Sequence, residues 1–253
     1  MASLDVESLF TNIPLEETID NIINDLYLST EKVHNFEKHE LKQLLMFAAF
    51  ESFFVFDGEY YIQVDGVAMG SPLGPNLANA FLCYYEKNWL RECPENFLPN
   101  VYKRYVDDIF VTFDSYSQLL KFVDYMNHQH PNLKFTFEVE QNNSFSFLDV
   151  KICRENDRFT TSIYRKPTFS GVFTHFDSFI PTSYKHDLVN TLIFRCFKIC
   201  SSYEKIHNEI VSLKDILKHN SYPKNFIDNC IKIFSINSMF PRKFIKQLRK
   251  NLY

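Results

Sequence analysis

Tyr105-Val106-Asp107-Asp108 is the stretch around which the chain is organised, and it lies between two β-prone runs at 101–104 and 109–113. Two such runs joined by a short polar segment predict a tight β-hairpin with the acids at its turn. A turn lets both carboxylates lean towards one point, whereas neighbours in a regular strand point to opposite faces. Asp also favours turns through its own backbone preferences, so a plain polar turn is the simpler alternative.

A third carboxylate, Asp5, favours a cation site over a plain polar turn. Asp5 lies in an equally apolar setting that resembles the end of a buried strand, and three of the five glycines, Gly66, Gly70 and Gly74, cluster between the two acidic segments. Glycine lets a backbone approach a ligand closely, and this cluster precedes a predicted helix whose N-terminus carries unpaired N–H groups. Neither a Walker loop nor a dinucleotide fingerprint occurs. A tight loop without a ligand is the alternative.

Apolar periodicity predicts a mixed α/β region followed by helices. Helices are expected from Pro14 and over 38–50, 75–91 and 115–128, a strand over 133–140, and hairpins that pair 53–56 with 60–63 and 145–153 with 159–165. The turn Asp57-Gly58 is a strong signal for the first hairpin. From about residue 183 the pattern is helical, over 183–200, 202–219, 223–234 and 241–251. The expected fold class is α+β, with one domain at 1–167 and a helical module at 168–253.

Composition and charge restrict the class of protein. The longest apolar runs are too short to span a bilayer, no secretory signal opens the chain, and no membrane partner is expected. Six cysteines without a C-x-x-C pair favour a reduced, intracellular protein. Residues 195–253 hold 12 Lys plus Arg against 4 Asp plus Glu, and residues 1–194 hold 15 against 27. This division of charge suits a protein that binds metal ions with its acidic N-terminal part and nucleic-acid phosphates with its basic C-terminal part. The alternative is a solvated helical surface that is rich in lysine.

Three segments in order resemble the palm motifs of reverse transcriptases. LDVESLFTNIP at 4–14 resembles motif A, DGVAMGSPLGPNLANAF at 65–81 resembles motif B, and RYVDD at 104–108 resembles motif C. FLDVKI at 147–152 and SIYRKPTFSG at 162–171 are similar to the continuation in Penelope-like retroelements. The resemblance implies a palm of ferredoxin-like topology with the helical module in the place of a thumb. The fingers strands that the family places before motif A, and a GIY-YIG endonuclease after the thumb, are expected to be absent.

The resemblance also implies a two-metal site. Asp5 and Asp107 would bind both Mg²⁺ ions, the Val6 carbonyl would help to hold one of them, and Asp108 would be an auxiliary carboxylate, with Mn²⁺ as an alternative ion. Mg²⁺ prefers a few protein oxygens together with phosphates and water, which suits three acids without a histidine. The implied reaction is in-line attack of a primer 3′-hydroxyl on the α-phosphate of a deoxynucleoside triphosphate, dNTP.

Four residues form the dNTP-binding set that the resemblance implies: Phe10, Gly66, Met69 and Gly70. Phe10 occupies the place of the steric gate that collides with a ribose 2′-hydroxyl, and a core phenylalanine is the alternative. The glycines would let backbone lie close to the nascent base pair. Met69 stands where many relatives carry Gln, so a side-chain contact made by that Gln does not carry over.

Tyr164, Arg165 and Lys166 fall where a primer-grip hairpin would touch backbone phosphate, and a surface basic pair is the alternative. The expected function is RNA-directed DNA polymerase of a retrotransposon, with an RNA template, a DNA primer and dNTP as partners and a nuclear location. The alternative class is a catalytically inactive nucleic-acid-binding remnant whose helices over 182–234 act like a helix-turn-helix. A metal-dependent nuclease fits less well, because it would need a histidine or further carboxylates. The oligomeric state stays open.

Overall fold

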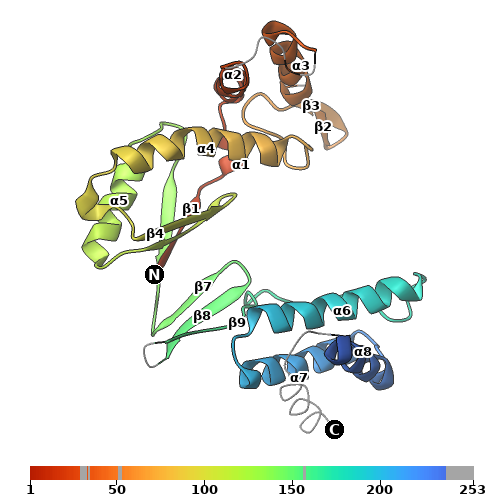
Figure 1. Cartoon of the computed structure of the whole chain (residues 1–253). Coiled ribbons are helices and arrows are strands. Elements are labelled where there is room, and N and C mark those ends of the chain that lie inside the picture. The colour runs from red at the N-terminus through yellow and green to blue at the C-terminus, as the bar shows by residue number, and fades with distance from the viewer. Residues whose placement is uncertain (29–32, 34, 51–52, 156–157, 238–253) are drawn as a thin grey trace. The chain divides into compact units, whose positions relative to one another are not determined.

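The computed structural model of the chain describes residues 1–28, 33, 35–50, 53–155 and 158–237 and forms two compact units, Met1–Val139 and Glu140–Tyr253 (Figure 1). Each unit has its own apolar core. The boundary differs from the expected one after residue 167, because the small sheet of residues 144–163 packs on the helices that follow it. The helix expected over 241–251 lies outside the described residues.

The N-terminal unit is built on a four-stranded antiparallel sheet with the order β4-β5-β1-β6. Its strands are β1 (Ala2–Val6), β4 (Val101–Tyr105), β5 (Asp108–Thr112) and β6 (Phe135–Val139). Helices separate β1 from the β4–β5 hairpin, and α5 (Tyr116–Asn127) separates that hairpin from β6. This βαββαβ order with the first and third strands adjacent is the ferredoxin-like arrangement. The hairpin around the two acids and the palm topology are thus confirmed.

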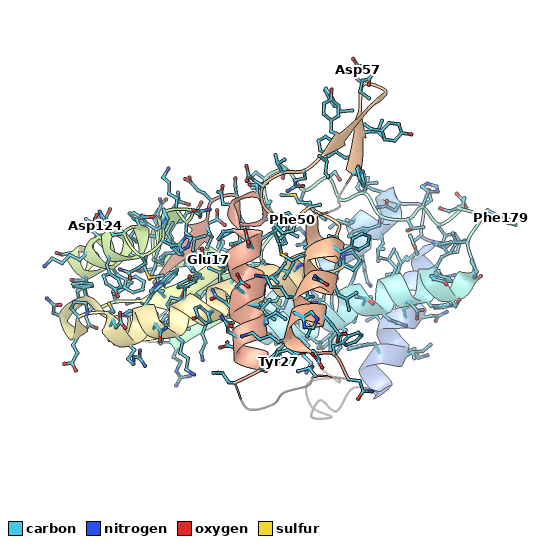
Figure 2. All side chains as sticks on the ribbon, turned by 90° about the horizontal axis from the view of Figure 1, so that it is seen from above. Glu17, Tyr27, Phe50, Asp57, Asp124 and Phe179 are labelled. Atoms are coloured by element: carbon cyan, nitrogen blue, oxygen red, sulfur yellow. The ribbon has the colours of Figure 1, made fainter. Side chains whose placement is uncertain are left out.

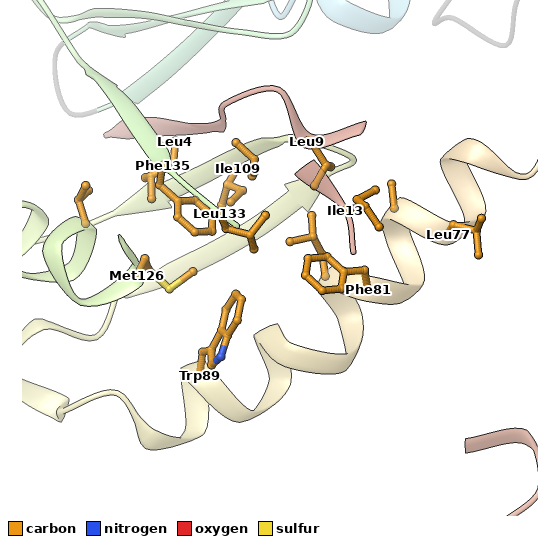
Figure 3. Packing of buried hydrophobic residues seen from close by; sticks show 14 of the residues in the cluster. Leu4, Leu9, Ile13, Leu77, Phe81, Trp89, Ile109, Met126, Leu133 and Phe135 are labelled. Carbon is orange, nitrogen blue, oxygen red and sulfur yellow. The ribbon is translucent and has the colours of Figure 1, made fainter. Parts of the chain in front are cut away.

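One face of this sheet carries the core. Alternate residues of β1 and β5, among them Leu4 and Ile109, are fully buried, as the period of two along a strand requires. Helices α4 (Gly74–Glu92) and α5 contribute Phe81 and Met126 to the same cluster (Figure 3). Asp5 has the opposite parity to Leu4, so it lies on the other face of the sheet.

A helical insertion and an exposed hairpin lie between β1 and α4. The insertion comprises α1 (Leu9–Asn12), α2 (Leu15–Leu26) and α3 (Lys38–Phe50). Among the described strands, β2 (Phe53–Phe56) pairs with β3 (Glu59–Ile62) in a separate two-stranded sheet. Both residues of the turn have positive φ, 50° at Asp57 and 81° at Gly58, as the Asp-Gly pair predicts. Asp57 marks the projecting tip of the hairpin in Figure 2. A short 3₁₀ helix, η1 (Glu95–Phe97), connects α4 to β4.

The C-terminal unit combines a three-stranded sheet with three helices. The sheet contains β7 (Ser144–Phe147), β8 (Val150–Glu155) and β9 (Arg158–Ile163), and the helices are α6 (Thr182–Ile199), α7 (Tyr203–His219) and α8 (Lys224–Asn237). The expectation of one strand over 145–153 is wrong. Leu148 has φ 53°, and the turn at Leu148-Asp149 folds the segment into the β7–β8 hairpin. The helices expected over 183–200, 202–219 and 223–234 are confirmed.

Buried apolar residues hold the three helices of this unit together. Val189, Ile210 and Ile227 come from α6, α7 and α8 in turn and belong to one cluster. All six cysteines of the chain are free thiols, in accord with the absence of a C-x-x-C pair. In the part of the chain that the structure describes, no helix combines the length and the apolar character needed to cross a membrane.

Candidate active site

The three acids singled out in the sequence come together at one end of the palm sheet. β1 and β5 pair antiparallel with Asp5 directly opposite Asp108, and opposed residues of such a pair share one face of the sheet. Asp107 precedes Asp108 in the turn, and its carbonyl accepts a hydrogen bond from the Val6 N–H at 3.3 Å. Strand pairing therefore brings motif A and motif C side by side, although about a hundred residues separate them in the sequence.

Negative charge accumulates around Asp5 at this end of the sheet. Burial raises the pKa of Asp5 above its usual value, and the charges of Asp107, Glu7 and Glu138 raise it further. Of the nearby cations, Lys134 pairs with Glu7 at 3.0 Å and Arg104 pairs with Glu86 at 2.9 Å. No cation of the described residues forms an ion pair with Asp5 or Asp107.

These residues fit a divalent cation held by oxygen atoms. Like charges opposed across a strand pair destabilise a sheet, and Mg²⁺ bound between them would remove that repulsion. Within the described ranges, no group of three or more His, Cys, Asp or Glu side chains is already arranged to hold a metal ion. The fit therefore rests on the strand register and on the unneutralised charge at Asp5.

Helix α4 fixes the position of the acidic turn through Arg104. Val106 in the turn has φ 56°, a left-handed conformation that costs a β-branched residue free energy. The Arg104 Nη1 group donates to the Val106 carbonyl at 3.1 Å and to Asn79 Oδ1 at 3.1 Å. Its Nε donates to both carboxylate oxygens of Glu86, at 2.9 and 3.0 Å. Because Asn79 and Glu86 both belong to α4, this network ties the turn to the helix of motif B.

The pair of Arg104 and Glu86 is nearly closed to solvent. The side chains are 7% and 14% exposed, and the Tyr102 hydroxyl donates a further hydrogen bond to Glu86. Burial lowers the pKa of Arg104, but the hydrogen bond and the charge of Glu86 outweigh it and raise that pKa above the usual value. Asn79, Glu86 and Arg104 were not among the functional residues predicted from the sequence. The spacing of Asn79 and Glu86, seven residues apart, places them on one helix face, but no local pattern shows that this face meets β4.

We expect Arg104→Met to destabilise the N-terminal unit by about 3–5 kcal/mol, because it leaves the Glu86 carboxylate buried without its partner. The free energy of unfolding is measured in urea by the fluorescence of Trp89, the single tryptophan, which is buried in this unit. Lys103→Met on the same strand removes an exposed cation and is the matched control, with an expected change below about 0.5 kcal/mol. Equal effects of the two substitutions would contradict the anchoring role.

Gly66 brings motif B against motif A. Its φ is +70°, and a Cβ added there would lie 2.5 Å from the Phe10 carbonyl oxygen and 2.5 Å from Thr11 Cα. The next residue, Val67, donates its N–H to the same Phe10 carbonyl at 2.7 Å. Close approach of two backbone segments is therefore one physical reason for glycine here. The expected contact of Gly66 with a nascent base pair stays a prediction.

The other members of the expected dNTP-binding set lie near this contact or in the open loop. Phe10 is partly buried against the core, and its ring lies 3.5 Å from a Cβ placed on Gly74. Gly70 has φ +97° with nothing within 4 Å of an added Cβ, and Met69 is 76% exposed. Gly70 is thus free of the crowding that surrounds Gly66, and the roles of Phe10, Met69 and Gly70 stay predictions.

Tyr164, Arg165 and Lys166 belong to the C-terminal unit and follow β9. The Arg165 guanidinium donates two hydrogen bonds to the Glu209 carboxylate of α7, one of them at 2.9 Å. Lys166 is exposed and forms no ion pair with any described residue. Lys166 is therefore available for the expected contact with phosphate, whereas Arg165 is already paired with Glu209.

Comparisons with known proteins agree with this arrangement. A family model described as reverse transcriptase (RNA-dependent DNA polymerase) matches residues 1–142, and a model of the animal helix-turn-helix domain matches residues 172–232. Telomerase from Candida albicans, solved with the TWJ fragment of telomeric RNA, is 15% identical with a TM-score of 0.57, and the match covers 97% of this chain and 41% of that chain. None of the curated proteins matches the chain.

A viral polymerase has the same fold. The Sicinivirus 3Dpol RNA-dependent RNA polymerase is 14% identical with a TM-score of 0.51, and the match covers 90% of this chain and 50% of that chain. The chain thus spans half or less of these two solved structures. At such identities the likeness concerns the fold, and it agrees with the α+β palm followed by helices.

Proposed function

Because the chain belongs to the reverse transcriptase family, we propose that it is an RNA-directed DNA polymerase that extends a DNA primer on an RNA template. The observation that carries the proposal is the pairing of Asp5 with Asp108 next to Asp107, at the end of a ferredoxin-like sheet. The finer assignment to a Penelope-like retrotransposon rests on the segments at 147–152 and 162–171. A nuclear location is part of the same proposal.

The carboxylates are the groups that would hold two Mg²⁺ ions, or Mn²⁺ in their place. Asp5 and Asp107 would be the principal ligands, with the Val6 carbonyl and Asp108 as auxiliary ones. When bound, the ions supply activation of the primer 3′-hydroxyl and neutralisation of the triphosphate. The chain itself contributes the positions of these acids, which the β1–β5 register and the Arg104 network set.

Phe10 is proposed as the group that distinguishes dNTP from ribonucleotides. It follows β1 within the short helix α1, five residues beyond Asp5, and its backbone is held by the contact with Gly66 and Val67. An aromatic ring at this position after motif A would collide with a ribose 2′-hydroxyl. Met69 and Gly70, in the open loop before α4, would complete the nucleotide site.

The test is Mg²⁺-dependent extension of a DNA primer on an RNA template by the 253-residue chain. We expect incorporation of dNTP to exceed that of ribonucleotides. Phe10→Ala should raise ribonucleotide incorporation by about tenfold, because removal of the ring removes its collision with the 2′-hydroxyl. Leu9→Val, a conservative change at the neighbouring buried position, is the control and should leave sugar selectivity unchanged. Unaltered selectivity in Phe10→Ala would remove Phe10 from the gate role.

The second candidate is a catalytically inactive nucleic-acid-binding remnant. The helix-turn-helix model that matches residues 172–232 favours it, because this match covers α6 and α7 and much of α8. A folded chain that binds an RNA–DNA hybrid with strong salt dependence, but does not extend the primer, would support this candidate over the polymerase.

The acidic cluster also predicts a link between stability and pH. The pKa of Asp5 in the folded chain lies above its unfolded value near 3.8, so ionisation of Asp5 costs the folded state free energy. That cost is absent at pH values below the pKa of Asp5 in the unfolded chain. It grows as the pH rises from there to the pKa in the folded chain, and it is complete above that value. Asp5→Asn should therefore raise the melting temperature at pH 7 and leave it unchanged near pH 3.

Differential scanning fluorimetry with and without Mg²⁺ measures this effect. Mg²⁺ is expected to raise the melting temperature of the unsubstituted chain at pH 7 and to have less effect on Asp5→Asn, because a ligand is missing. Asp57→Asn, at the exposed tip of the β2–β3 hairpin, is the control. A melting temperature of Asp5→Asn below that of the unsubstituted chain at pH 7 would refute the repulsion at this site.

A further inference from the structure

A pocket of about 340 Å³ opens within the C-terminal unit, outside the residues matched by the reverse transcriptase model. Its walls come from the β7–β8 turn, from β9 and the segment that follows it, and from α6 and α7. Both helices pack on β9, and Figure 1 shows these elements of the unit. A volume of this size lies at the low end of the range for small-molecule sites, about 300–1,000 Å³. It suits a ligand of one ring system with a short polar extension and is too small for a double helix.

Two ion pairs form the polar wall of the pocket. Arg165 is paired with Glu209, whose side chain is 10% exposed, and Arg195 is paired with Asp149 at 2.7 Å. Each pair is neutral as a whole, but its members keep N–H groups and carboxylate lone pairs that are not used within the pair. The wall therefore offers hydrogen-bond donors and acceptors side by side.

Apolar and aromatic groups form the rest of the lining. Leu213 is buried, and Phe169, Phe173 and Leu192 belong to the same surface. The Arg165 guanidinium lies over the Phe169 ring at 5.4 Å from its centre, so the polar wall and the aromatic wall meet at that residue. A flat ring with polar edges would match this combination better than an aliphatic chain or a simple anion.

Lys166 adds a positive charge to the pocket lining. It is exposed, lines the pocket and forms no ion pair with any described residue. With Arg165 and Arg195 set against Asp149 and Glu209, Lys166 leaves the lining with one uncompensated positive charge. A ligand with a single phosphate next to its flat ring would satisfy this charge.

We propose that this pocket binds one nucleotide, with its base against Phe169 and the two ion pairs and its phosphate at Lys166. A nucleobase carries donors and acceptors on its edge and a π-face for stacking, and both features have counterparts in the lining. The inference deepens the proposed function, because it rests on a nucleic-acid substrate, and it assigns to the segment after β9 a contact with a base in addition to a phosphate.

The binding of deoxyadenosine monophosphate to the 253-residue chain is measured by isothermal titration calorimetry in EDTA, which suppresses metal-dependent binding at the acids. Deoxyribose 5-phosphate, which lacks the base, should bind about tenfold more weakly, because stacking and edge contacts are lost. Lys166→Glu should weaken nucleotide binding by about tenfold or more. Lys198→Glu changes the net charge equally at an exposed site outside the lining and should have little effect.

A second variant guards against misfolding as an explanation. Thr168 is exposed and lines the pocket, so Thr168→Trp should fill part of it and block the nucleotide without disturbing the core. A short single-stranded oligodeoxynucleotide is titrated in parallel. Dependence on Lys166 for the mononucleotide identifies a free nucleotide as ligand, and the same dependence for the oligonucleotide alone identifies a nucleotide within a strand.

The proposal is overturned if neither ligand depends on Lys166, or if the base makes no contribution to binding. Asp107→Ala should bind the nucleotide as the unsubstituted chain does, because Asp107 does not line the pocket. Primer extension without Lys166-dependent nucleotide binding would support the polymerase proposal and refute nucleotide binding in the pocket. Lys166-dependent nucleotide binding without primer extension would support the pocket proposal and contradict the polymerase proposal. The two failures are therefore distinguishable.

Discussion

Asp107→Ala is expected to abolish primer extension, with a loss of at least about a thousandfold, while binding of the primer–template hybrid changes little. Asp107 lies in the turn between β4 and β5, and its carbonyl accepts a hydrogen bond from the Val6 N–H. Its negative charge raises the pKa of Asp5. Removal of one carboxylate from a site that concentrates negative charge would leave too few oxygen ligands for two divalent ions. Binding of the hybrid depends on phosphate contacts elsewhere and should survive.

Extension is followed on a labelled primer with an RNA template, and binding by fluorescence anisotropy over a range of salt concentrations. Asp114→Ala is the matched control: Asp114 lies just beyond β5, is exposed and accepts a hydrogen bond from Asn100. It should retain extension, because its carboxylate does not face Asp5. Extension by Asp107→Ala at the rate of the unsubstituted chain would refute the assignment of the acids.

Gly66→Ala should cost the N-terminal unit about 3 kcal/mol or more of its free energy of unfolding. The new Cβ would meet backbone atoms of Phe10 and Thr11 at 2.5 Å, and backbone cannot move aside as a flexible side chain can. The positive φ of 70° adds strain for any residue with a Cβ. Because motif A would have to shift, extension should fall together with stability.

Gly70→Ala separates crowding from backbone strain. Gly70 also has a positive φ, 97°, but nothing lies within 4 Å of an added Cβ. Its substitution should therefore cost only about 1 kcal/mol. Unfolding in urea, followed by Trp89 fluorescence, compares the two variants in the same unit. A Gly66→Ala variant no less stable than Gly70→Ala would show that the two backbones can separate without cost.

Local patterns predicted most of the elements. The β-prone runs around Asp107 and Asp108, the Asp-Gly turn at 57–58 and the apolar helical spacing over 38–50 all depend on neighbours within a few residues, and each of these elements is present. The prediction of one strand over 145–153 was wrong because its apolar residues continue through Leu148, and leucine rarely adopts the left-handed conformation found there. The Asp in Leu148-Asp149 was the only turn signal.

Other features depend on which distant segments meet. Local sequence patterns alone indicate that three acids lie in apolar β-prone settings, that glycines cluster between them and that helices follow. The folded chain is needed to see that Asp5 lies opposite Asp108, that Gly66 has the Phe10 carbonyl as its neighbour and that α4 holds the acidic turn through Arg104. The physical reason is that strand register and helix contacts are set by burial of whole faces and by backbone pairing across a hundred residues, whereas sequence periodicity reports only which face of an element is apolar.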